Sequence, residues 1–156
     1  MNNEDLLPLE FRSATTLLSL LRARKLGALE LLDLQLARIG RTNPALNAVV
    51  SMDVERARSA ARAADSAGLA GCGPLHGVPI TIKDAYEVVG MPATCGFPHL
   101  AKHVPARDAD AVARLRAAGA IPFAADFLSA GTYRLFLQFK IDEVVHTAGF
   151  TVEVAP

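Results

Sequence analysis

Cysteine is scarce in this sequence of 156 residues, with Cys72 and Cys95 as its two examples. They form neither a Cys-x-x-Cys pair nor a spacing typical of zinc sites, which argues against a disulfide-rich secreted fold and against a zinc module. We therefore expect both thiols to be reduced, as in a cytoplasmic protein.

Neither sign of charge is in excess, because Lys+Arg and Asp+Glu both number 16. No basic face of the kind that nucleic-acid binding needs is evident, so we expect no nucleic-acid partner. No apolar run approaches the ~20 residues that span a bilayer, and the acidic N-terminus is unlike a signal peptide. These absences predict a cytoplasmic location and no membrane association.

Hydrophobic residues make up 51% of the chain, and its length suits one domain over residues 1–156. Ser13 and Asp53 are good helix N-caps, and we expect helices from Ser13 to near Gly27 and from Val54 to Ser66. Between them, apolar residues at helical spacing predict a helix that ends at Gly40, before an Asn43-Pro44 turn and a strand at 47–52.

The second half alternates strands and helices. Strands are expected at 78–83 and 120–125, with Pro79 marking an edge or a bulge. Residues 84–107 read as a long irregular loop, and Asp108 as the cap of a helix through Ala118. A helix over 143–149 and a strand over 150–154 close the chain, while 133–140 fits either a strand or a helix. Such alternation predicts an α/β layered domain with a short mixed sheet flanked by helices.

Lys83 is the first candidate for chemistry. Along the strand at 78–83, Val78, Ile80 and Ile82 face a core, so Thr81 and Lys83 face the other way, and Asp84 is a poor partner for the lysine. Partial loss of water around an ammonium group favours its neutral form, which can act as a base. From these residues alone, a solvated lysine at a strand end is the simpler interpretation.

The segment Gly73-Pro74-Leu75-His76-Gly77-Val78-Pro79-Ile80-Thr81-Ile82-Lys83-Asp84 resembles the Gly-Val-Pro-x-x-x-Lys-Asp motif of the amidase signature family. The early helices, Asn43 to Ala48, Thr94 with Gly96, and the stretch from Asp108 to Ala120 follow in the family's order. The resemblance implies a truncated amidase signature fold, with a tail at 1–12, an amidase-like region at 13–123 and a divergent segment at 124–156. It also implies a hydrolase of amide bonds without metal or organic cofactor.

By the same resemblance, Lys83 matches the base of a Ser–cis-Ser–Lys triad. The family carries both serines in a downstream Gly-Gly-Ser-Ser-Gly-Gly type loop, and no serine of this sequence has that context. Ser129, in Ser129-Ala130-Gly131, comes nearest, and a serine beside glycine is ordinarily a turn residue. Residues 142–156 resemble a helix–strand piece from later in the family, which suggests an internal deletion.

Two other groups of residues are also candidates for a functional site. Cys95 could pair with a histidine as a nucleophile, and His76, His99 and His103 could form a zinc site, although nothing in the spacing enforces either. Plain surface histidines are the simpler interpretation, and His146 is expected in the last helix.

The leading hypothesis is an amidase-derived chain that is inactive alone. One alternative is a split amidase in which a complementing chain supplies the serines and a small-molecule amide is the substrate. Another is a non-catalytic interaction protein. A cut sheet with an unpaired edge and zero net charge favour self-association, so we expect a homo-oligomer that buries Tyr133 to Phe139.

Overall fold

The structure is a computed structural model that describes residues 7–126, 131–141 and 144–154. A 3-10 turn, Leu9–Phe11, precedes helices α1 (Ala14–Arg22) and α2 (Ala28–Leu46). Strand β1 (Val49–Met52) leads into α3 (Val54–Ser66), and β2 (Pro79–Lys83) follows a glycine-rich loop. A second 3-10 turn, Pro98–Leu100, interrupts the long loop before α4 (Asp110–Ala117) and β3 (Ile121–Asp126). Strands β4 (Gly131–Ile141) and β5 (Val144–Val154) end the chain.

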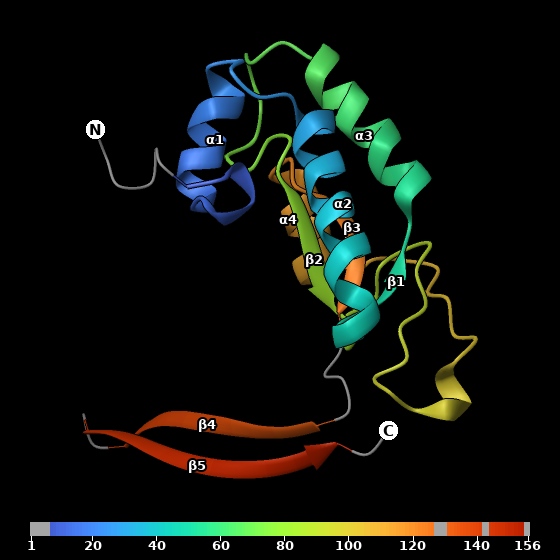
Figure 1. Cartoon of the computed structure of the whole chain (residues 1–156), viewed down its shortest axis with the longest axis vertical. Coiled ribbons are helices and arrows are strands. Elements are labelled where there is room, and N and C mark those ends of the chain that lie inside the picture. The colour runs from blue at the N-terminus through green and yellow to red at the C-terminus, as the bar shows by residue number, and fades with distance from the viewer. Residues whose placement is uncertain (1–6, 127–130, 142–143, 155–156) are drawn as a thin grey trace.

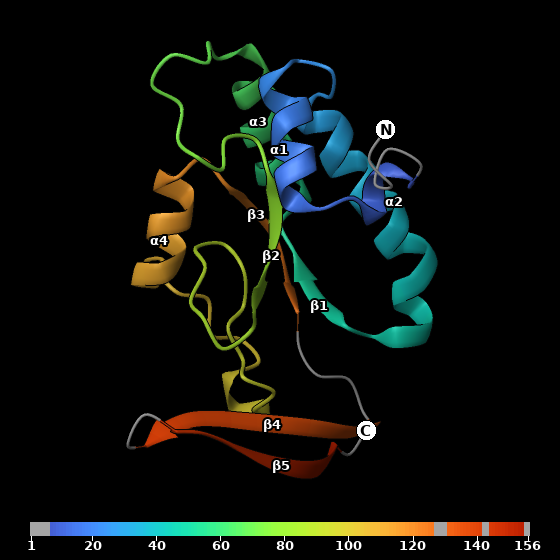
Figure 2. The ribbon, with the colours of Figure 1, turned by 90° about the vertical axis from the view of Figure 1, so that its left-hand side faces the viewer.

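Three strands form a mixed sheet in the order β1-β3-β2. Strand β3 runs antiparallel to β1 and parallel to β2, and it lies between them. Helix α4 lies on one side of the β2–β3 pair, with α1 and α2 on the other (Figures 1 and 2). The expected α/β domain with a short mixed sheet flanked by helices is confirmed.

Two apolar clusters hold these layers together. The larger joins α1, α2 and α3 to the sheet through Leu21, Leu32, Ala61 and Phe123, among others. The smaller joins β2 and the long loop to α4 through Ile82, Val88, Met91 and Val112. Because both clusters share Ile80 of β2 at their margins, this strand is held from both sides. The carboxyl end of β2 is thereby fixed in position.

Several local predictions are confirmed. The Ser13 and Asp53 side chains accept hydrogen bonds from the backbone amides of Thr16 and Arg56, as N-caps should. Strand β2 is an edge of its sheet, and its register with β3 shifts between Ile80 and Thr81. Pro79 therefore occurs where its missing amide proton is tolerated.

The predicted end of the second helix at Gly40 is wrong. Helix α2 continues through Gly40 and Pro44 to Leu46, and Asn47 takes the left-handed C-cap position with φ of 48°. The Asn43 side chain holds this last turn, because it donates to the Val49 carbonyl oxygen and accepts from the Val49 amide. These contacts with β1 outweigh the local tendency of glycine and proline to end a helix.

Two further boundaries differ from prediction. Helix α4 begins at Asp110 with Ala109 as its N-cap, because the Asp108 carboxylate instead accepts from the Val89 amide at 2.8 Å and from Arg116 Nε at 2.8 Å. The expected helix over 143–149 is wrong, since residues 144–149 belong to β5 and pair with β4. The segment 133–140, which fitted either structure, is strand.

Candidate functional site

Lys83 is the last residue of β2, where the strand meets the long loop. It pairs in register with Asp126 of β3, which pairs in turn with Val49 of β1, so the three residues form one row across the sheet. Ile82 is buried, Thr81 is exposed and Lys83 is half-buried. The expectation that Val78, Ile80 and Ile82 share one core side is wrong, because Val78 and Ile82 pack in different clusters and the β2–β3 register shifts between Ile80 and Thr81.

A shallow groove lies along the face of β2 that carries Thr81. Thr81 and Pro79 line it together with Gln35, Arg38 and Thr42 of α2, around a volume of about 350 Å³. The apolar residue Ile39 of α2 also lines the groove, as do Val49 and Phe123 of the sheet. Lys83 is two residues beyond Thr81 on the same face, so the groove leads toward the lysine.

Asp84 is buried, with 1% of its surface exposed, directly after the lysine. Its amide donates to the Asp126 carbonyl oxygen at 2.8 Å, which extends the β2–β3 pairing by one residue. Its carboxylate accepts from the Thr94 amide at 2.9 Å and from the Thr94 hydroxyl at 2.5 Å. The carboxylate thus fastens the returning loop to the end of β2.

The loop at 94–96 turns tightly against that strand end. Cys95 has φ of 49°, a conformation that non-glycine residues rarely adopt, and its amide donates to the Asp84 carbonyl oxygen at 3.4 Å. The Gly96 amide donates to the Thr94 hydroxyl at 3.1 Å. Sequence reasoning did not predict this cluster. In the sequence, Asp84 and Thr94 are ten residues apart, and only the fold brings their side chains together.

The rest of the long loop is fixed to α4 and α3. The Glu87 carbonyl oxygen accepts from the Ala109 amide at 2.8 Å, and the Val89 carbonyl oxygen accepts from the Arg56 guanidinium at 3.1 Å. Val88 and Met91 of this loop are themselves buried and pack with Ile82 and Val112. A loop held at so many points gives the residues around Lys83 a defined geometry, as a site requires.

The Cys95–His76 nucleophile pair does not form. His76 precedes β2, and its Nε2 lies 3.1 Å from the Ala64 carbonyl oxygen. Cys95 adjoins Asp84 at the opposite end of the strand, so about five strand residues, roughly 16 Å, separate them. Both cysteines are free thiols, as expected.

The zinc site does not form either. His103 pairs with Glu87 at 3.1 Å, and the His99 ring stacks on Phe97 with centroids 5.5 Å apart. Within the described ranges, no group of three or more His, Cys, Asp and Glu residues lies close enough to hold a metal ion. His146, expected in a helix, belongs to β5, and Ser129 lies outside the described residues.

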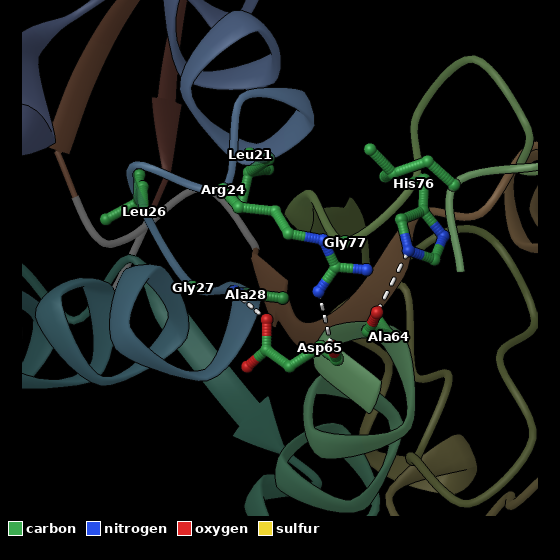
Figure 3. A pocket seen from close by; sticks show the side chains of 10 residues that line it. Leu21, Arg24, Leu26, Gly27, Ala28, Ala64, Asp65, His76 and Gly77 are labelled. Atoms are coloured by element: carbon green, nitrogen blue, oxygen red, sulfur yellow. Dashed lines mark hydrogen bonds between the residues drawn. The ribbon is translucent and has the colours of Figure 1, made fainter. Parts of the chain in front are cut away.

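A deeper pocket of about 250 Å³ lies at the other end of β2, between α1, the start of α2 and the end of α3 (Figure 3). Its polar groups are engaged with the protein itself. Arg24 donates to the Asp65 and Ala67 carbonyl oxygens, and the Asp65 carboxylate accepts from the Ala28 and Leu29 amides. Because Gly77 of its wall precedes β2, the pocket is remote from Lys83 and is not part of that site.

In the part of the chain that the structure describes, no helix is both long and apolar enough to cross a membrane.

Comparison with known proteins places these features in a family. The Amidase family profile matches residues 30–130. A glutamyl-tRNA(Gln) amidotransferase subunit of Azoarcus sp. (strain BH72) is 44% identical over 110 residues, which are 70% of this chain and 23% of that protein. The same subunit of Roseiflexus sp. (strain RS-1) is 44% identical over 98 residues, 62% of this chain and 20% of that protein.

A solved structure described as a crystal structure of amidase superposes with a TM-score of 0.63 and 36% identity, covering 73% of this chain and 26% of that one. The chain thus spans about a quarter of the length of the relatives that it matches. The match includes the segment from Gly73 to Asp84 that carries the lysine motif. This chain belongs to the amidase signature family.

Proposed function

We propose that this chain provides the base of an amide-hydrolysing site, with Lys83 as that base, and that the nucleophilic serine comes from a complementing chain. The single observation that supports this most is the position of Lys83. It ends an edge strand two residues beyond Thr81, which lines the groove, and the Asp84–Thr94 hydrogen bonds fix the backbone next to it.

The chemistry follows from the family resemblance. The neutral amine of Lys83 accepts a proton that a middle serine relays from the nucleophilic serine. The serine oxygen then attacks the amide carbonyl carbon, and backbone amides stabilise the negative charge that develops on the carbonyl oxygen. The C–N bond breaks, the leaving amine takes up the proton, and water hydrolyses the resulting ester. No metal or organic cofactor takes part.

A partner has to supply the loop that carries both serines. No serine among the 156 residues stands in a Gly-Ser-Ser-Gly context, so the isolated chain should be inactive. A base without a nucleophile has no proton to accept. Activity is expected only where a Gly-Ser-rich segment reaches the groove beside Thr81, with a small-molecule amide as the substrate.

The test compares the isolated chain with an amidase chimera. In this chimera, residues 30–126 of the chain replace the matching segment of the Azoarcus sp. relative, whose remaining length supplies the serine loop by family resemblance. Ammonia release from simple amides is measured. We expect none from the isolated chain, measurable turnover from the chimera, and a loss of about 10²–10⁴-fold in the chimera carrying Lys83→Ala.

Lys102→Ala is the matched control, because Lys102 is an exposed lysine of the same loop region. It should leave turnover unchanged. Turnover by the isolated chain that disappears in Lys83→Ala would contradict the complementation proposal, because it would require a nucleophile within these 156 residues.

A non-catalytic role as an interaction protein is the second candidate. The observation that favours it is the β4–β5 hairpin, which lies beyond the end of the family match at residue 130. A stable assembly of this chain, together with an inactive chimera, would favour this candidate over the hydrolase.

A further inference from the structure

Three polar residues of α2 line the groove beside Thr81. Gln35, Arg38 and Thr42 follow one another at steps of three and four residues, which places them on one face of the helix. Their guanidinium, amide and hydroxyl groups are all hydrogen-bond donors. The helix therefore offers the groove a row of donors.

The charge of the groove has one sign. Among the eight described residues that line it, Arg38 alone is charged, and four are apolar: Ile39, Val49, Pro79 and Phe123. An apolar cavity with a few fixed polar groups is typical of small-molecule sites, and its volume of about 350 Å³ falls in their usual range of about 300–1,000 Å³. Because none of these lining residues is acidic, the groove favours a ligand with negative charge.

The N-terminal 3-10 turn holds the Arg38 side chain in place. Arg38 Nη1 donates to the Glu10 carbonyl oxygen at 2.9 Å, and the guanidinium carbon lies 4.5 Å from the centroid of the Phe11 ring. A guanidinium has five N–H donors, and in the described part of the chain Arg38 uses one. The Glu10 carboxylate is itself paired with Arg41 at 3.9 Å. Arg38 is thus oriented before a ligand arrives and keeps donors for it, which lowers the entropic cost of binding.

We propose that this groove binds the carboxylate of a substrate that carries a carboxylate and an amide at opposite ends of a short aliphatic chain. The planar guanidinium of Arg38 matches a carboxylate through two parallel hydrogen bonds, and the apolar lining contacts the chain. Lys83 follows Thr81 by two residues, roughly 7 Å along the strand, so the amide end extends toward the base. The amide end of this inference rests on the proposed function, whereas the carboxylate end rests on the groove alone.

A titration of the full chain followed by nuclear magnetic resonance tests the carboxylate end without catalysis. The probes are glutaramate, with a carboxylate at one end and an amide at the other, and pentanamide, which has the same carbon chain without the carboxylate. We expect saturable shifts of α2 and β2 amide signals, with glutaramate bound at least about 10-fold more tightly than pentanamide. No saturable binding of glutaramate, or equal binding of the two amides, would overturn the proposal.

Variants of two arginines on α2 locate the binding. Arg38→Gln should weaken glutaramate binding by about 10-fold or more, and Arg38→Lys, which keeps the charge but loses the planar fork, should give an intermediate affinity. Arg41→Gln is the matched control, because Arg41 is an exposed arginine one turn further along that does not line the groove. It should stay within about twofold of the unmodified chain. Equal losses in Arg38→Gln and Arg41→Gln would contradict the assignment. The comparison of the two probes on the unmodified chain does not depend on how a variant folds.

Turnover separates this inference from the proposed function. The chimera for this test begins at residue 7 of the chain, so that it includes Glu10 and Phe11 as well as Lys83. We expect kcat/KM for glutaramate to exceed that for pentanamide by about 10-fold or more, and Arg38→Gln to remove the preference through KM. Equal kcat/KM for the two amides would overturn the inference and leave the proposed function intact. A chimera that binds glutaramate through Arg38 but hydrolyses neither amide would contradict the proposed function, and with it the approach of the amide end to Lys83.

Discussion

The carboxylate of Asp84 accepts two hydrogen bonds from one residue, the amide and the hydroxyl of Thr94, at 2.9 and 2.5 Å. This pair closes the long loop onto the end of β2, immediately beside Lys83. The carboxylate is buried, so its two acceptor bonds have little competition from water. The geometry around the candidate base depends on this link between residues ten positions apart.

Removal of the link should destabilise the domain. Asp84→Ala leaves the Thr94 amide and hydroxyl without their acceptor, and hydrogen bonds to a charged group are worth about 1.5–3 kcal/mol each. We expect a fall of about 3 kcal/mol in the free energy of unfolding, measured by urea denaturation. Thr94→Val should lose less than Asp84→Ala, because its backbone amide still donates to Asp84, although the Gly96 amide also loses its acceptor. Thr94→Ser keeps both donors and should stay within about 1 kcal/mol of the unmodified chain. If Asp84→Ala left the free energy of unfolding unchanged, Asp84 would not fasten the loop to the end of β2.

Asp65 caps a helix that is not its own. Its carboxylate, near the end of α3, accepts from the Ala28 and Leu29 amides at the start of α2, where Gly27 has no side chain to do so. Asp65→Ala should lower the free energy of unfolding by about 1–2 kcal/mol, the usual cost of a lost N-cap.

The control for this prediction is Asp33→Ala, which removes a surface ion pair with Arg58. Exposed ion pairs contribute about 0–1 kcal/mol, so the two aspartates should differ in thermal denaturation midpoint. Equal midpoints would mean that Asp65 does not act as a cap.

Substitution by alanine should change the free energy of unfolding in opposite directions at two glycines. Gly119 has φ of +91°, and an added Cβ would lie 2.8 Å from His76 Cα, so Gly119→Ala should cost about 3 kcal/mol. Gly40 lies inside α2 with nothing within 4 Å of an added Cβ, so Gly40→Ala should stabilise by about 1 kcal/mol. If Gly40→Ala were destabilising, Gly40 would end the helix, as the sequence alone predicted.

Gly40 also illustrates what local sequence signals miss. Glycine followed by Asn43-Pro44 resembles a helix end, and only the tertiary contact between Asn43 and Val49 explains why α2 continues. The error over 144–149 has a similar origin. Local signals there predicted a helix, and the pairing with β4 decides in favour of a strand.

Lys83 was predictable for the opposite reason. The strand that carries it is short and begins with a proline that suits an edge, so its position at a strand end follows from local sequence signals. The Asp84–Thr94 link was not predictable, because loop closure over ten residues leaves no periodic pattern. For the same reason, the prediction of Asp108 as a helix N-cap failed. Its carboxylate accepts hydrogen bonds from Val89 and Arg116 instead.

The most direct test of the account is whether Lys83 activates a serine in a completed amidase site. A fluorophosphonate probe reports this without knowledge of the substrate, since the serine oxygen bonds to phosphorus and fluoride leaves. The chimera with residues 30–126 of this chain should be labelled, and Lys83→Ala should slow labelling by about 10²-fold or more, while Lys102→Ala should not. Equal labelling rates for the Lys83→Ala chimera and the unmodified chimera would contradict the assignment of Lys83 as the base.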